Sequence, residues 1–362
     1  MLLSLSGSWM DQAGAWFLQS GIQEACGGVA RYYRSDLGAN ARISTEITGY
    51  AASLLVYLHR ATGQAAYLEA ARRAGRFLTR QAWDGAAATV PFEYAVDGSR
   101  PQAFFFDLGI IVRGLLALWR ATGEREFLET AEACAASMAR DFAAGEEFHP
   151  IVVLPEKRPV AREARWSRRP GCYQLKSALA WYELFEETGR EEYRARYEQV
   201  LEFALRTQAS FLPGETQPER IMDRLHAYCY FLEGLLPCAG RPECSGALAE
   251  GIRRTAVLLD EIAPVFERSD VVAQLLRLRL LAAKLAAVPL DAARATREAA
   301  SIRDFQLEHQ DPRVGGGFGF GRQGVELLPF VNPVSTAFSV QALRMWLQSE
   351  AGQLEAAWQT LI

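Results

Sequence analysis

The chain has 362 residues, half of them hydrophobic, and its formal net charge is −4. This charge argues against a general nucleic-acid-binding protein, which carries an excess of basic residues. No apolar run approaches the roughly 18 residues that a membrane span needs, so we expect neither a nucleic-acid partner nor a membrane span.

The N-terminal residues have neither the basic segment nor the sustained apolar segment of a signal peptide. Six cysteines without paired close spacing indicate reduced thiols and argue against a disulfide framework or a zinc site. No Pro/Gly/Ser-rich linker interrupts the chain. We therefore predict a soluble, cytoplasmic protein in which residues 1–362 form a single domain.

Three segments repeat the pattern of a helical hairpin. Each has an apolar helix-like stretch, a Thr-Gly pair and a second helix-like stretch. The pairs are Thr62-Gly63, Thr122-Gly123 and Thr188-Gly189. Their spacing suits two helices plus a long return loop, which indicates an internal repeat of hairpins.

The first helix of each hairpin is apolar nearly all round, whereas the second carries charges at helical spacing. An apolar helix is buried and a helix with a charged face is exposed, so the hairpins predict an inner and an outer ring. Weaker patterns continue this series and predict six inner helices that start near residues 46, 107, 173, 223, 270 and 335. The last outer helix is either the tail 352–362 or the N-terminal segment 7–25. Short strands are expected at 89–96 and 150–155.

This all-α pattern resembles the (α/α)6 toroid of six-hairpin glycosidases, polysaccharide lyases, sugar epimerases and the terpenoid-cyclase/prenyltransferase group. Residues 310–346 are similar to the Q-x-x-GGFG…S-T-x-A-x-x-AL repeat of prenyltransferases and squalene cyclases, and residues 22–33 are similar to its first half. The whole chain also resembles uncharacterised toroid proteins of bacterial polysaccharide biosynthesis. The resemblance implies the fold and a carbohydrate context.

Departures from these families limit the chemistry. The chain has neither the DxDD run of triterpene cyclases nor the DDxxD motif that binds a diphosphate through magnesium. No Asp-x-Cys follows the glycine-rich segment, and no histidine adjoins a cysteine. A zinc site needs three or four converging nitrogen or sulfur ligands, so we expect no metal and no cofactor.

In a toroid the starts of the inner helices surround one end of the central cavity, so polar residues there converge. Asp107, Asp223 and Asp270 would serve equally well as helix caps or first-turn acids, and this alternative stays open. The predicted catalytic residues are Glu46, Asp107, Asp223, His226 and Tyr228. Predicted substrate-binding residues at the same helix starts are Tyr50, Tyr173, Gln174, Lys176, Arg224, Asp270 and Asn332.

His226 is the best single catalytic candidate. Asp223, His226 and Tyr230 lie on one stripe of the predicted helix. An acid one turn before a histidine is an arrangement that orients an imidazole for proton transfer. The alternative is a hydrogen-bonded core histidine without a catalytic role.

Two loops add candidate binding residues. Residues 156–169 contain six basic side chains and Trp166, which indicates an electropositive lid for an anionic ligand. A solvated surface loop is an equally good interpretation of that run. The predicted binding residues from these loops and from the glycine-rich segment are Arg31, Tyr32, Trp166, Arg168, Arg169 and Arg322.

We therefore predict a carbohydrate-active enzyme that performs acid/base chemistry on a bacterial polysaccharide or oligosaccharide, including an anionic one. Glycoside hydrolysis, elimination and epimerisation stay open. Two carboxylates at a defined separation would favour hydrolysis, whereas a His/Tyr pair beside an arginine would favour a lyase or an epimerase. The alternatives are a terpenoid cyclase or prenyltransferase-like enzyme, with an apolar cavity, and a non-catalytic sugar-binding or scaffold protein.

Overall fold

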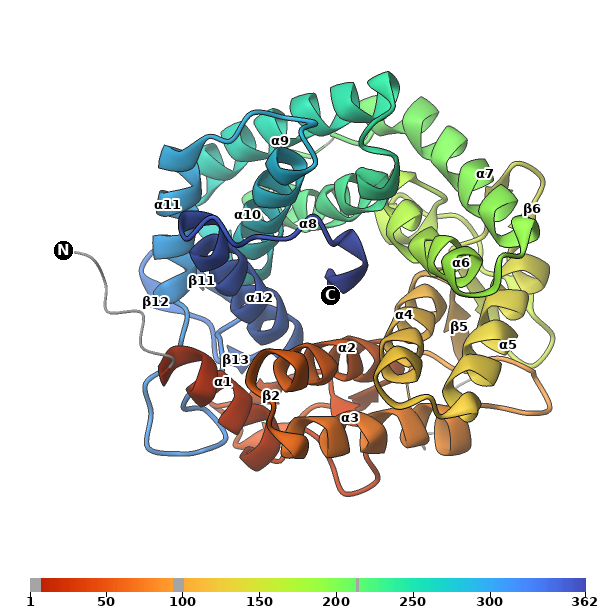
Figure 1. Cartoon of the computed structure of the whole chain (residues 1–362), viewed down its shortest axis with the longest axis horizontal. Coiled ribbons are helices and arrows are strands. Elements are labelled where there is room, and N and C mark those ends of the chain that lie inside the picture. The colour runs from red at the N-terminus through yellow and green to blue at the C-terminus, as the bar shows by residue number, and fades with distance from the viewer. Residues whose placement is uncertain (1–7, 94–100, 213–214) are drawn as a thin grey trace.

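The computed structural model describes residues 8–93, 101–212 and 215–362, and two concentric rings of helices dominate it (Figure 1). The inner ring consists of α2 (Thr45–Thr62), α4 (Phe105–Thr122), α6 (Leu175–Thr188), α8 (Pro218–Leu235), α10 (Ser269–Lys284) and α12 (Pro333–Glu350). The outer ring consists of α1 (Ser8–Gln19), α3 (Ala65–Phe77), α5 (Arg125–Asp141), α7 (Glu191–Thr207), α9 (Pro242–Ile262) and α11 (Ala292–Arg303). The predicted all-α toroid is confirmed.

The ring closes because each inner helix packs on the next and α12 returns to α2. Helix α1 packs on both α3 and α12, so the N-terminal segment completes the outer ring. The C-terminal segment instead runs into the middle of the ring (Figure 1). There the side chains of Lys176 and Arg277 donate hydrogen bonds to the backbone oxygen of Ile362.

The Thr-Gly pairs end three inner helices in the same way. Gly63, Gly123 and Gly189 have φ values of 72°, 68° and 70°. Each glycine N–H donates to a carbonyl four residues back, as in a left-handed helix cap. The threonine hydroxyl before each glycine donates to the helix carbonyl four residues before it. A side chain at the glycine would be strained in this conformation, which explains why glycine recurs at the C-terminal ends of these three helices.

Helix α8 differs most from its predicted start. It begins at Pro218, well before the expected position 223. A proline suits the first helical turn because its missing N–H has no partner there in any case. Asp223 and Arg224 therefore lie in the second turn of α8, and their roles as first-turn residues were predicted wrongly.

Short strands connect outer helices to the next inner helices. They are β1 (Val29–Ala30), β2 (Tyr33–Arg34), β3 (Ala39–Asn40), β4 (Ile43–Ser44), β5 (Gln102–Phe104), β6 (Ala143–Ala144), β7 (Glu147–Phe148), β8 (Ile151–Val153), β9 (Arg158–Pro159), β10 (Phe266–Arg268), β11 (Gly321–Gln323), β12 (Glu326–Leu327) and β13 (Phe330–Val331). Their antiparallel sheets have the orders β1-β4, β13-β2-β3, β5-β8-β9, β10-β11-β12 and β6-β7. These pairings fix the loops at one end of the ring.

The two strand predictions had different outcomes. The strand expected at 150–155 is β8. At 89–93 the chain forms only isolated bridges, with Thr89 opposite Asp84 and Glu93 opposite Ser44. Residues 94–96 of that prediction lie outside the described residues.

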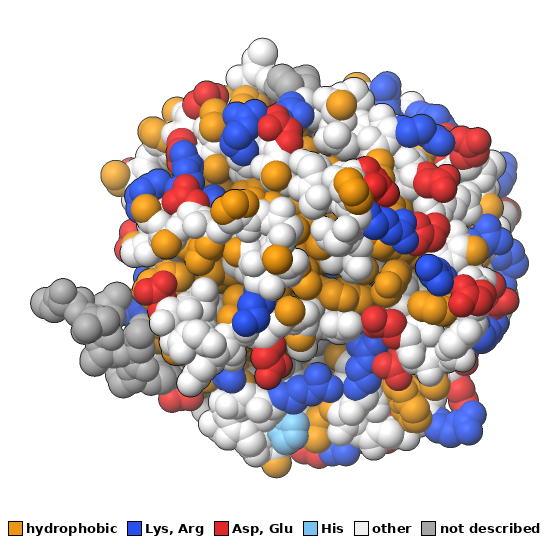
Figure 2. Space-filling model, turned by 45° about the horizontal axis from the view of Figure 1, so that its top comes forward, with side chains coloured by type: hydrophobic (Ala, Val, Ile, Leu, Met, Phe, Trp, Pro, Cys, Tyr) orange, Lys and Arg blue, Asp and Glu red, His pale blue; other side chains and the backbone are white. Residues whose placement is uncertain are grey.

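The inner helix α4 is buried along most of its length, whereas the outer helix α5 buries only one face, as the helix patterns predicted. On the face drawn in Figure 2, charged side chains of both signs gather around the rim and hydrophobic side chains occupy more of the middle. Within the described ranges, no helix is both long and apolar enough to cross a membrane.

Candidate active site

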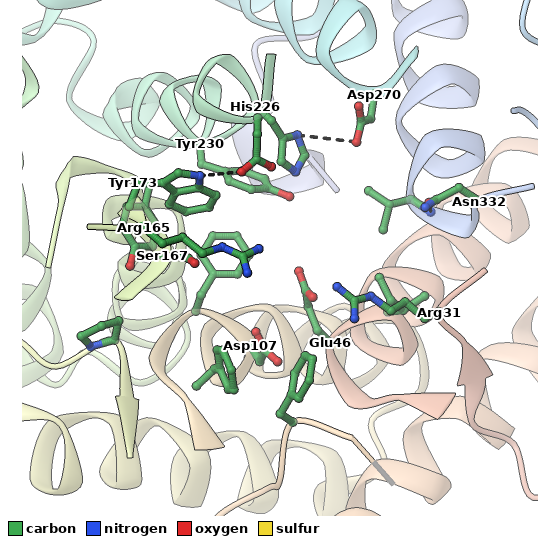
Figure 3. A pocket seen from close by; sticks show the side chains of 18 of the residues that line it. Arg31, Glu46, Asp107, Arg165, Ser167, Tyr173, His226, Tyr230, Asp270 and Asn332 are labelled. Atoms are coloured by element: carbon green, nitrogen blue, oxygen red, sulfur yellow. Dashed lines mark hydrogen bonds and ion pairs between the residues drawn. The ribbon is translucent and has the colours of Figure 1, made fainter. Parts of the chain in front are cut away.

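A cavity of about 680 Å³ opens at the end of the ring where the inner helices begin. All six hairpins line it, each through an inner helix or the loop that leads into one. Figure 3 labels one such residue from each hairpin: Glu46, Asp107, Tyr173, His226, Asp270 and Asn332. The sequence argument placed these six residues together, and the closed ring explains why residues so distant in sequence meet.

His226 faces the cavity from α8 and is held at its Nδ1 atom. This nitrogen lies 2.7 Å from the Oε1 atom of Gln274 and 3.6 Å from the Oδ2 atom of Asp270. An amide oxygen facing the ring places the proton on Nδ1, so Nε2 is left as the acceptor. Nε2 has no hydrogen-bond partner in the described part of the chain and points into the cavity (Figure 3).

The surroundings of His226 keep its imidazole neutral. Burial lowers the pKa of His226 below its ordinary value, and the charge of Arg268 lowers it further. The carboxylates of Asp270 and Asp223 act in the opposite direction without reversing the result. A neutral histidine with a free nitrogen is a general base.

Arg268 is the main site residue that the sequence argument missed. It ends β10, and its guanidinium forms a fork on Asp270, with Nε–Oδ1 and Nη2–Oδ2 distances of 3.0 and 2.6 Å. A third hydrogen bond, of 3.2 Å, joins it to Asp223. Burial alone would raise the pKa of Asp270, but the charge and hydrogen bonds of Arg268 outweigh it and keep this pKa below its ordinary value. Asp270 is therefore an ionised partner of Arg268 and His226.

Two signals in the sequence point to these missed residues. Arg268 comes directly before a predicted inner helix, and Gln274 lies one helical turn after Asp270 on the same face. Neither signal shows that Gln274 and Asp270 contact His226, because His226 comes from a different hairpin.

Asp223 joins the site to the loop 156–169. Its Oδ2 atom accepts a hydrogen bond of 2.6 Å from the indole N–H of Trp166, and its Oδ1 atom accepts one from Arg268. The expectation that Asp223 orients His226 directly is corrected, because the hydrogen-bond partner of the imidazole is Gln274. Gln274 takes this place because α10 packs on α8 and brings its amide group to the imidazole.

Glu46 and Asp107 face the cavity from the side opposite His226 (Figure 3). Burial raises the pKa of Glu46 to about 7, although the charge of Arg31 acts against this rise. Burial also raises the pKa of Asp107 well above its ordinary value, and the charge of Glu46 adds to this rise. The Oδ2 atom of Asp107 has no hydrogen-bond partner among the described residues. Glu46 therefore titrates near neutral pH, whereas burial and the charge of Glu46 favour the protonated form of Asp107.

The mouth of the cavity is aromatic and basic. Trp166 packs edge-on against Tyr173, with ring centroids 4.9 Å apart. The other residues that line the mouth and walls include Arg31, Tyr32, Phe104, Phe106, Arg165, Arg168, Tyr230 and Phe320. Tyr230 lies against His226, with ring centroids 4.5 Å apart. Aromatic faces with nearby charged groups suit the C–H faces and hydroxyls of sugars.

Two predicted residues of α8 face away from the cavity. Two residues along a helix turn the side chain by about 200°, so Arg224 and Tyr228 lie opposite the stripe of His226. Arg224 donates to the backbone oxygen of Phe211, and the hydroxyl of Tyr228 donates to Gln208. The structure therefore places both side chains outside the cavity that their predicted roles require.

Five further predicted binding residues lie outside the lining of this cavity. Gln174 accepts from the Gly171 N–H and donates to the Phe148 oxygen, as a cap of the turn before α6. Arg169 is exposed and donates to the backbone of Glu163. The other three are Tyr50, Lys176 and Arg322. Tyr50 packs edge-on against Phe338. Lys176 forms an ion pair of 2.8 Å with Glu233, and Arg322 forms one with Glu267.

No group of three or more His, Cys, Asp or Glu side chains suited to a metal ion occurs in the described part of the chain.

No family model and no curated protein matches this chain. Solved structures do match. A sugar epimerase from a ruminal bacterium has a TM-score of 0.70 at 12% identity, over 93% of this chain and 98% of that chain. A D-mannose isomerase has a TM-score of 0.70 at 10% identity, over 95% of this chain and 97% of that chain.

The cellobiose 2-epimerase from Spirochaeta thermophila has a TM-score of 0.65 at 16% identity, over 95% of this chain and 100% of that chain. At such identities the likeness is one of fold. The chain therefore has the (α/α)6 toroid fold over its length, in common with these sugar epimerases and this isomerase.

Proposed function

We propose that the protein is a carbohydrate-active enzyme that moves a proton at a carbon atom of a sugar, as an epimerase or isomerase does. The observation that carries this proposal is the placement of two proton carriers on opposite walls of one cavity. His226 is a neutral base with a free Nε2, and Glu46 has a pKa of about 7. A base on one side and an acid on the other are what inversion at a carbon requires.

In the proposed reaction Nε2 of His226 removes a proton from a carbon next to a carbonyl or carboxyl group. The C–H electron pair passes into that group as an enolate. The carboxyl of Glu46 then donates its proton to the opposite face of that carbon. The new C–H bond inverts the configuration at the carbon. After the product leaves, His226 releases its proton to solvent and Glu46 takes one up, which restores both groups for the next turnover.

Other features support a sugar as the substrate. The cavity volume falls within the range of roughly 300 to 1,000 Å³ that is usual for small-molecule sites. The solved structures that share the fold include proteins described as acting on mannose and cellobiose. Charged groups around the whole cavity argue against the terpenoid alternative, which needs a mainly apolar cavity.

A second candidate reaction is glycoside hydrolysis. Glu46 and Asp107 are two carboxyls that face the same cavity, and the charge of Glu46 adds to the rise in the pKa of Asp107. Such a pair can divide the roles of acid and base between them. Asp223 and Asp270 are less suitable for hydrolysis, because Arg268 engages both of them. The non-catalytic alternative predicts acids used up as helix caps, which does not describe the unpartnered Oδ2 of Asp107.

The proposal keeps three expectations that rest on the sequence. These are a cytoplasmic location, a role in bacterial polysaccharide biosynthesis and a single domain over residues 1–362. They do not enter the chemical argument.

The test is incubation of the purified protein in D₂O with mannose, cellobiose, glucuronic acid and their oligosaccharides, followed by proton NMR. Epimerisation or isomerisation gives a new sugar with deuterium at the reacting carbon and no additional reducing ends. Hydrolysis gives new reducing ends without carbon-bound deuterium, and elimination gives an unsaturated sugar that is detected by its new ultraviolet absorbance. No carbon-bound deuterium with any of these sugars would contradict the main proposal.

A further inference from the structure

One cation of the cavity, the guanidinium of Arg165, has no counter-ion among the described residues. The side chain of Arg165 lines the cavity, and it forms no hydrogen bond or ion pair with any described residue. The other cavity arginines do have partners. Arg168 lies 3.2 Å from Glu163, Arg268 is engaged by Asp223 and Asp270, and Arg31 lies 3.7 Å from Glu93.

Arg165 and Arg31 reach into the cavity from opposite sides, and Glu46 lies between them in the view of Figure 3. Arg165 comes from the loop before α6, and Arg31 comes from the loop before α2. Arg31 is about half exposed and shares Glu93 with Arg42, so its ion pair is loose and its guanidinium remains accessible.

The carboxyls that line the cavity are not paired with Arg165. Asp223 and Asp270 are engaged by Arg268. Asp107 is neutral because its pKa lies well above the ordinary value, and Glu46 is about half ionised near pH 7. None of these carboxyls forms an ion pair with Arg165, so among the described residues its guanidinium is the cavity cation without a carboxylate partner.

We propose that Arg165 and Arg31 bind an anionic oxygen group of the sugar, either a carboxylate or a phosphate, and so make the protein selective for acidic sugars. Guanidinium groups suit both anions, because their N–H donors form charge-assisted hydrogen bonds to paired oxygens. This inference rests on the proposed function, since it names the class of sugar that enters the same cavity.

A carboxylate would also assist the proposed chemistry. When a cation neutralises a carboxylate, the carbon next to it loses its proton more readily, because the resulting charge is spread over the carboxylate oxygens. In a hexuronic acid this carbon is a ring carbon. His226 would receive the proton from it and Glu46 would return one, so no further reactant is needed.

The experiment measures the binding of glucuronic acid, glucose 6-phosphate and glucose by titration calorimetry, at low and at moderate salt. The wild type should bind at least one of the two acidic sugars about tenfold more tightly than glucose, and this preference should shrink as salt rises. Whichever acidic sugar binds more tightly identifies the source of the anionic group.

Arg165→Ala should weaken the binding of the acidic sugar about tenfold and leave the affinity for glucose unchanged. Arg158→Ala is the matched control, because Arg158 is an exposed arginine of the same basic loop that does not line the cavity. Its substitution should leave the binding of all three sugars unchanged. Thermal melts of both variants should match that of the wild type, because both side chains are exposed.

Equal binding of acidic and neutral sugars by the wild type would overturn this inference. Equal losses in Arg165→Ala and Arg158→Ala would also overturn it. The proposed function would survive either result if deuterium still entered a neutral sugar. If no sugar binds and no deuterium is incorporated, both proposals fail together.

Discussion

Two groups of charged side chains lie inside this ring, and they differ in whether each charge has an oppositely charged neighbour. In the middle of the ring, Glu233 lies 2.8 Å from Lys176 and 2.7 Å from Arg277, and all three side chains are fully buried. Nearby, Glu183 lies 2.6 Å from Arg113 and from Arg120. Around the cavity, by contrast, Arg165, the Nε2 atom of His226 and the Oδ2 atom of Asp107 lack partners among the described residues.

This difference distinguishes the charged groups that stabilise the fold from the groups that are available to a ligand. Lys176 and Asp270 both follow the start of an inner helix, yet Lys176 packs against Glu233 whereas Asp270 lines the cavity. Burial lowers the pKa of Lys176 to about 7, although the charge of Glu233 opposes that change. A shifted pKa therefore occurs in both groups, and only an unpartnered atom that faces a cavity distinguishes the site.

The largest expected effect follows from His226→Gln. If His226 is the base, turnover should fall by about 10² to 10⁴, because that is the usual contribution of a general base. The fold should survive, since the imidazole borders the cavity and glutamine can still hydrogen-bond to Gln274. Turnover and a thermal melt measure the two effects. A destabilised variant with normal turnover would assign His226 to the structure and remove it from the mechanism.

Glu233→Ala should affect stability instead. It leaves Lys176 and Arg277 as buried charges without their carboxylate, which costs about 3 to 5 kcal/mol of unfolding free energy. Glu250→Ala is the control, because Glu250 forms an exposed pair with Arg253 at 2.7 Å, and its loss should cost less than about 1 kcal/mol. Urea denaturation measures both. Equal stabilities of the two variants would refute the distinction between the two groups.

The pH dependence of turnover tests the acid. Glu46 donates a proton only while it is protonated, so turnover should fall as the pH rises through about 7. The charge of Arg31 lowers the pKa of Glu46, so Arg31→Ala should raise that pKa and move the alkaline limb to higher pH. A neutral sugar should be used, so that anion binding does not interfere. An alkaline limb that stays in place in Arg31→Ala would show that another group supplies the proton.

Trp166→Phe should have the smallest effect. It keeps an aromatic ring against Tyr173 but removes the hydrogen bond from the indole N–H to Asp223. A hydrogen bond of this kind contributes about 1 kcal/mol net, so we expect KM to rise about fivefold with little change in kcat. A fall in kcat with an unchanged KM would instead place the Trp166–Asp223 contact in the chemical step.

Local patterns explain what the sequence could predict. The Thr-Gly pivots and the contrast between apolar and charged helices depend on near neighbours in the chain, and they led to the two rings. The helix starts then placed Glu46, Asp107 and His226 at one cavity. The start of α8 at Pro218 was missed because the strong apolar pattern begins later than the helix does.

The partners of the site residues could not be predicted in this way. His226 is held by Gln274 and Asp270 of the next hairpin, and Asp107 is affected by Glu46 of the preceding one. Lys176 looked like a site residue because nothing nearby in the sequence shows that Glu233 meets it. Such pairings depend on how the hairpins rotate against one another, which a single sequence does not specify.

The pairing of β2 with β13 has a consequence for how the protein acquires its activity. It places Phe330 opposite Arg34 and so joins the loop of the first hairpin to that of the last. Bringing such distant segments together is entropically costly and slow compared with forming each hairpin. We therefore expect the hairpins to form early and the mouth of the cavity to be completed late. A chain interrupted before β13 would then retain helical structure and lack a complete binding site.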